Sequence, residues 1–155
     1  MTRHTFLLGT TALCAAGLLA VPAAPTATAA RPPAQPMRIR TLSATPHTVA
    51  RHGTLTFTAT VSGLILDLAH LGQRPRAGHG HLQYYLDRIP ADAWTRPDRH
   101  HGYIAAVATP RFFLAIVASP VRITPGTHRF LVALARNDGV LYHAPVASVR
   151  VTVTR

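Results

Sequence analysis

The chain has 155 residues and a formal net charge of +11, since its 16 basic residues are all arginine and its 5 acidic residues are all aspartate. Its single cysteine is Cys14, so disulfides, thiolate metal sites and cysteine nucleophiles are excluded from the rest of the chain. Stability must therefore come from an ordinary hydrophobic core.

The first 30 residues have the pattern of a secretory signal peptide, with an apolar run from about Phe6 to Val21 and small residues before an expected cleavage near Ala29 or Ala30. The run is short for a membrane span, which needs roughly 20 residues. An uncleaved anchor is the alternative. We therefore predict a secreted, extracytoplasmic protein with a signal peptide over 1–30, a proline-rich linker over 31–36, a domain over 37–155, and no stable membrane span after cleavage.

The domain reads as β-strands. Residues 54–62 and 147–154 alternate apolar and polar side chains, the pattern of a strand with one buried face. Proline and glycine turn signals separate five further expected strands. These are expected over 37–43, 80–87, 103–108, 112–118 and 127–136.

About seven strands with closely spaced turns predict an all-β fold, an antiparallel immunoglobulin-like or fibronectin-like β-sandwich. The cysteine pair of a true immunoglobulin domain is missing, and Trp94 lies in an expected loop. A closed barrel is the main alternative.

The segment GHGHLQYYLD raises the question of a metal site. On a strand, His79 and His81 project on one face with roots about 7 Å apart, close enough to hold copper or zinc between them. Asp87, His128 and His143 are the further candidate ligands. We favour the simpler interpretation, in which His79 and His81 are polar side chains on a solvent-facing strand surface.

The same segment carries a resemblance, together with TPGTHRFLVALARNDG and the final VASVRVTVT strand. The chain resembles a group of secreted bacterial immunoglobulin-like domains of unknown function, whose members carry a GxGHxHxYLD segment followed by PGxH and then Asn-Asp-His. The agreement extends from about Thr54 to Thr154. The matching positions are Gly80, His81, Tyr85, Leu86, Asp87, Pro125, Gly126, His128, Asn137 and Asp138.

The chain departs from this pattern at two positions. Gln83 stands where the resemblance places a second histidine, and Gly139 stands where it places the histidine after Asn-Asp. If the group binds metal through those histidines, this chain lacks part of the set, and His79 and His143 are the candidates to replace it. The resemblance implies an extracytoplasmic sandwich and little about activity.

No enzyme signature is apparent. The chain has no Gly-x-Ser-x-Gly elbow, which argues against a serine hydrolase. It has no glutamate, which argues against hydrolysis by a pair of carboxylates. We predict a non-catalytic binding or structural module at the cell envelope that needs no cofactor, with a copper or zinc carrier as the alternative. Its basic surface is expected to contact anionic envelope polymers rather than nucleic acid. The arginines expected there flank the histidine strand: Arg74, Arg76, Arg96 and Arg99.

Overall fold

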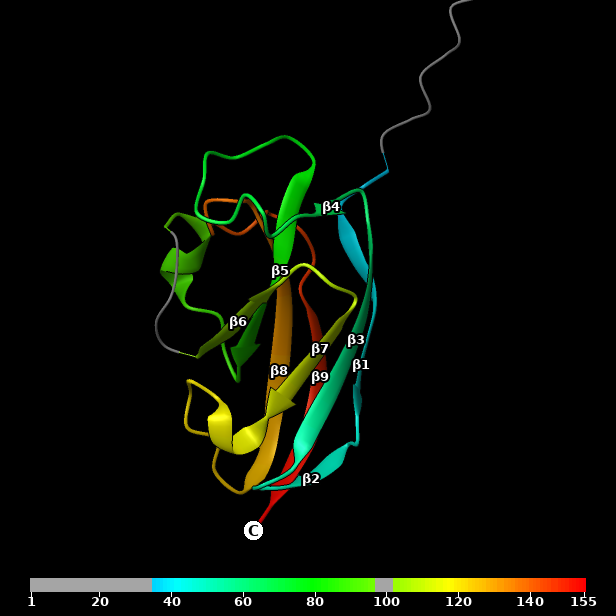
Figure 1. Cartoon of the computed structure of the whole chain (residues 1–155), viewed down its shortest axis with the longest axis vertical. Coiled ribbons are helices and arrows are strands. Elements are labelled where there is room, and N and C mark those ends of the chain that lie inside the picture. Colours follow the sequence, from blue (N-terminus) through cyan, green and yellow to red (C-terminus); the bar gives the residue numbers. More distant parts are fainter. Residues whose placement is uncertain (1–34, 97–101) are drawn as a thin grey trace, which may run out of the picture. The chain divides into compact units, whose positions relative to one another are not determined.

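The computed structural model describes residues 35–96 and 102–155 (Figure 1). The expected signal peptide and residues 31–34 of the expected linker lie outside this part. The strands in these two ranges are β1 (Arg38–Thr45), β2 (Thr48–Ala50), β3 (Thr54–Ser62), β4 (Ile65–Leu66), β5 (His79–Leu86), β6 (Tyr103–Val107), β7 (Arg111–Ala115), β8 (Gly126–Ala135) and β9 (Ala147–Thr154). Two 3-10 turns accompany them, η1 (Ala91–Trp94) and η2 (Ile116–Ala118).

The strands form two sheets that pack face to face (Figure 1). One sheet has the order β1-β3-β7, and the other has the order β2-β9-β8-β5-β4, with β6 also paired to β5. The long pairings, β1 with β3 and β5 with β8 among them, are antiparallel. The fold is therefore the predicted all-β sandwich.

Aromatic side chains from both sheets meet at the centre of the sandwich. Phe57 of β3 is fully buried, with its ring centroid 5.4 Å from that of Tyr84 and 5.0 Å from that of Phe130. Phe112 of β7 packs at 4.8 Å from Tyr84. Burial of these large rings is the main source of stability available to a domain without disulfides.

The seven expected strands are present, and the differences lie at their ends. The strand expected over 112–118 stops at Ala115, where η2 begins. Asp87 lies outside β5 because its φ of 61° turns the chain away from the sheet. The short strands β2 and β4 were not expected, and both pair in parallel, with β9 and β5 respectively.

Part of the expected linker belongs to the sandwich. The Ser62 hydroxyl donates a hydrogen bond to the Pro36 carbonyl over 3.2 Å. Gly63 has a φ of +72°, and a Cβ at this position would lie 2.4 Å from the Gln35 carbonyl oxygen. A glycine is required here because the backbone of residues 35–37 passes so close.

No helix in the described ranges, 35–96 and 102–155, is long and apolar enough to cross a membrane.

We predict that Phe57→Ala lowers the free energy of unfolding by about 3–5 kcal/mol, since it removes a ring from the centre of the core. Phe113→Ala is the matched control, because Phe113 lies on β7 with 65% of its surface exposed. The control is expected to change stability by about 0.5 kcal/mol or less. Urea unfolding of both variants measures the difference, and equal losses would contradict this account of the core.

Candidate functional site

Three side chains of β5 form a buried polar chain on the face opposite the aromatic core. The Tyr85 hydroxyl donates to the Gln83 Oε1 over 2.5 Å. The Gln83 amide nitrogen lies 3.2 Å from His81 Nε2 and donates to the Gly139 carbonyl over 3.0 Å. His81, Gln83 and Tyr85 have 0%, 2% and 0% of their surfaces exposed. The favoured prediction of a solvent-facing histidine surface is therefore wrong for His81.

Burial sets the protonation state of His81. Loss of hydration lowers the pKa of its imidazole from 6.5 to about 4, against an opposing effect of the Asp138 charge. The neutral ring accepts the Gln83 amide proton at Nε2, which places its own proton on Nδ1. Nδ1 has no hydrogen-bond partner within residues 35–96 and 102–155.

The second face of β5 is buried because η1 and the chain after β8 pack against it. Tyr85 lies in a small apolar cluster with Ala93 of η1, Ala133 and Leu141. The Leu141 amide donates to the Ala93 carbonyl over 3.0 Å, which joins the two covering segments. The sequence did contain a signal for this burial: the unbroken apolar run over 130–135 is typical of a strand covered on both faces.

His79 belongs to a different group of side chains. Its Nδ1 lies 3.3 Å from Asp67 Oδ2, and the Nδ1 of His70 lies 2.7 Å from the same oxygen. Burial raises the pKa of the Asp67 carboxyl, but the hydrogen bonds from His70 and His79 outweigh it, so this pKa is lowered. A guanidinium nitrogen of Arg76 lies 3.3 Å from His70 Nε2. These contacts fasten the loop between β4 and β5.

Asp87 and His128 form a third group, where β5 ends. His128 Nδ1 lies 2.9 Å from Asp87 Oδ2, and His128 Nε2 lies 2.8 Å from the Thr124 carbonyl. Burial lowers the pKa of His128, but these two acceptors outweigh it, so the pKa is raised. Only the imidazolium can donate to both acceptors. The Arg129 amide also donates to Asp87 Oδ1 over 2.8 Å, which closes the end of β5 against β8.

Of the five candidate metal ligands, the structure brings together only Asp87 and His128. His79 bonds to Asp67, His81 to Gln83, and the His143 ring stacks on Trp94 at 5.6 Å. Within residues 35–96 and 102–155, no three His, Cys, Asp or Glu side chains are arranged to hold a metal ion. Copper or zinc binding stays a prediction. Calorimetric titration with Cu(II) and Zn(II), repeated on His81→Ala, tests it, and equal heat from this variant would argue against it.

Polar residues that carry the sequence resemblance lie at the two ends of β5. His81 and Asp138 interact electrostatically at one end of β5, and Asp87 bonds to His128 at the other. The two departures from the pattern, Gln83 and Gly139, are in direct contact. Gly80, which matches the pattern, is needed for packing because a Cβ there would lie 2.0 Å from the Ala135 carbonyl oxygen.

The predicted basic loops both contact the chain that follows β8. The loop that carries Arg74 and Arg76 bonds to the turn after β8 through the Gly72 amide and the Asn137 carbonyl, 2.7 Å apart. Arg96 follows η1, which contacts the same turn through Ala93. All three arginines are exposed, and Arg99 lies outside the described residues.

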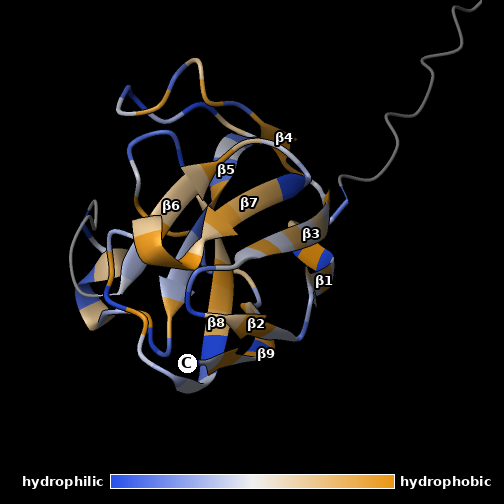
Figure 2. Cartoon of the chain, turned by 60° about the horizontal axis from the view of Figure 1, so that its bottom comes forward, coloured by the Kyte–Doolittle hydropathy of each residue, from blue (hydrophilic) through white to orange (hydrophobic). Residues whose placement is uncertain are grey.

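A second group of arginines lies on the outward side of β8 and β9 and was not predicted from the sequence. Arg129 of β8 and Arg150 of β9 are directly opposite each other in the antiparallel register, and a hydrophilic band crosses these two strands (Figure 2). With His47 and Ser148 they line a shallow cavity of about 510 Å³. Both arginines occupy outward positions of strands whose side chains alternate between the two faces. This alternation could have identified them from the sequence.

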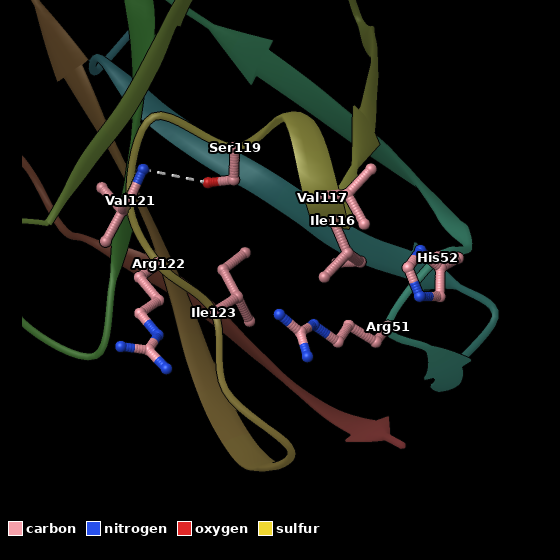
Figure 3. A pocket seen from close by; sticks show the side chains of 8 residues that line it. All are labelled: Arg51, His52, Ile116, Val117, Ser119, Val121, Arg122 and Ile123. Carbon is pink, nitrogen blue, oxygen red and sulfur yellow. Dashed lines mark hydrogen bonds between the residues drawn. The ribbon is translucent and has the colours of Figure 1, made fainter.

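Another cavity, of about 330 Å³, lies between the β2–β3 turn and the segment after β7 (Figure 3). We call it the end cavity. It is lined by Arg51, His52, Ile116, Val117, Ser119, Val121, Arg122 and Ile123.

No model of a known protein family matches this chain, and no curated protein matches it. Among solved structures, it is similar to the fibronectin(III)-like modules of CbhA from Clostridium thermocellum, at 15% identity and a TM-score of 0.40, over 77% of this chain and 48% of that chain. It is also similar to the alkylpurine DNA glycosylase AlkC from Pseudomonas fluorescens, solved bound to DNA containing an abasic site analog. This match has 17% identity and a TM-score of 0.39, over 77% of this chain and 30% of that chain.

A third similar structure is the extracellular domain of a one-component system from B. thetaiotaomicron, at 11% identity and a TM-score of 0.34, over 70% of this chain and 11% of that chain. The chain spans less than half the length of each of these three structures. Likeness at this level identifies neither a family nor a function.

We predict that His81 makes the stability of the protein depend on pH. Its pKa is about 4 when folded and 6.5 when exposed, so the unfolded chain binds more protons between these values. The contribution of His81 to the free energy of unfolding is fully present above pH 6.5. It decreases as the pH falls toward 4, by up to about 3 kcal/mol. The variant His81→Gln lacks this contribution.

Urea unfolding at pH 7.5 and 4.5 measures the effect. The wild type is expected to lose more stability than His81→Gln over this range, because every other titrating group is common to both. Parallel losses would contradict the prediction. If the variant does not fold, an NMR titration of the wild-type imidazole replaces the comparison, and a midpoint near 6.5 would be the contrary result.

Proposed function

We propose that this protein is a secreted, non-catalytic β-sandwich module that binds anionic polymers of the cell envelope. The binding surface is the outer basic face, which we define as Arg74, Arg76, Arg96, Arg129 and Arg150. Its ligands are chains of phosphate or carboxylate groups, which arginine recognises through its planar pair of N–H donors.

The observation that supports this proposal is the distribution of ion pairs. Within residues 35–96 and 102–155, Arg136 is the one arginine paired with an acid, through Asp138. Asp67 and Asp87 are paired with histidines instead. The arginines of the outer basic face therefore keep their charge uncompensated by carboxylates of the described chain.

The cross-strand pair adds a second argument. Arg129 and Arg150 are exposed and directly opposite, and like charges in this arrangement cost stability. The carboxylate of Asp87, which contacts this part of β8, is used on His128 and on the Arg129 amide. An anionic group bound between the two guanidinium groups would relieve their repulsion.

We expect replacement of the three loop residues Arg74, Arg76 and Arg96 by glutamine to weaken binding to dextran sulfate at low salt by about 150-fold, taking about 1 kcal/mol per charge. The double variant Arg129→Gln/Arg150→Gln is expected to weaken binding by about 30-fold on the same basis. Wild-type binding should fall steeply as salt is raised.

The matched control replaces Arg38, Arg40 and Arg111, which are exposed on the other sheet. It removes the same number of charges as the loop variant but should leave binding largely unchanged. Equal weakening by the control and loop variants would show that only net charge matters. An affinity that does not change with salt concentration would rule out the electrostatic mechanism.

A further inference from the structure

The end cavity has an apolar floor. Ile116 and Ile123 are almost fully buried and belong to the central core. Beside them, Val117 leaves 59% of its surface exposed although it is a branched apolar side chain. Figure 3 shows the side chains of Ile116 and Ile123 next to each other in the middle of the cavity. An apolar group entering the cavity would cover this surface.

Two cations flank the floor. Arg51 comes from the turn after β2 and Arg122 from the chain before β8, and Ile123 lies between them (Figure 3). In the described ranges neither guanidinium forms an ion pair or a hydrogen bond. The Ser119 hydroxyl is occupied, since it accepts the Val121 amide over 3.2 Å.

Backbone hydrogen bonds hold the two walls of the end cavity in place. The Arg51 amide donates to the Thr154 carbonyl over 3.0 Å, and the Gly53 amide donates to the Ala50 carbonyl over 2.8 Å. The Ile116 amide then donates to the Gly53 carbonyl over 3.0 Å, which joins the turn to η2. A cavity formed before the ligand arrives avoids the entropic cost of ordering its walls.

We propose that the end cavity binds a medium-length aliphatic carboxylate, with the alkyl chain on Ile116, Val117 and Ile123 and the carboxylate at one of the two flanking arginines, Arg51 or Arg122. The size follows from the volume of about 330 Å³, which holds about ten non-hydrogen atoms if each takes the roughly 30 Å³ of a liquid water molecule. Octanoate has this size.

The head group follows from the surroundings. A guanidinium fork matches the two oxygens of a carboxylate. A phosphate monoester carries nearly two charges and loses more hydration beside an apolar floor. The carboxylate is therefore the better match for this cavity. The site is separate from the outer basic face, so its failure would leave the proposed function standing, and the reverse also holds.

An NMR titration of the isotope-labelled protein with octanoate tests the proposal. Saturable shifts are expected in the amides of 51–53 and 116–123, with a dissociation constant of about a millimolar, the order expected for a ligand of this size. Octan-1-ol and acetate, which lack the head group and the long chain respectively, should bind at least tenfold more weakly. Octyl phosphate should bind more weakly than octanoate.

The variant Arg51→Gln/Arg122→Gln removes the two charges and should weaken octanoate binding at least tenfold. Val117→Ser should weaken it by a smaller factor. The control Arg38→Gln/Arg40→Gln removes the same charge from exposed positions on β1, outside both sites, and should bind octanoate as the wild type does.

Three results would overturn the proposal. Shifts that spread over the whole surface without saturating would show that no site exists. Equal weakening by Arg51→Gln/Arg122→Gln and its control would show that position does not matter. Tighter binding of octyl phosphate than of octanoate would reject the carboxylate as the head group.

Discussion

The structure depends on β5, a strand that is buried on both faces. One face of β5 packs Tyr84 into the aromatic core, and the other places Gln83 and Tyr85 under η1 and the turn after β8. Polar groups on such a face are costly unless they bond to each other or to backbone, because water does not reach them. The contact between Gln83 and the Gly139 carbonyl answers this requirement and fixes the turn that follows β8.

The two-layer fold and its seven long strands could be predicted from the sequence, because period-two alternation and turn residues act locally. The cover on the outer face of β5 could not be predicted as easily. It depends on η1, a short turn whose apolar side chains include Ala93, and on the chain near Leu141. Neither segment has a hydrophobic period of its own, so its burial becomes evident only when the sheet is assembled.

The histidine contacts could not be predicted either, because they also depend on segments that are distant in the sequence. Spacing along the strand placed His79 and His81 side by side, but it did not show that Asp67 would take the first and Gln83 the second. Asp87 and His128 are 41 residues apart, and they meet because β5 and β8 are antiparallel neighbours. Pairings between strands distant in sequence set these partners, and no local pattern contains them.

The six-stranded sheet ends in short strands. β2 has 3 residues and lies at one edge, while β4 has 2 residues and shares the other edge with the 5-residue β6. An incoming chain finds few consecutive unpaired amides and carbonyls on such borders, so addition of a strand from a neighbouring molecule is disfavoured.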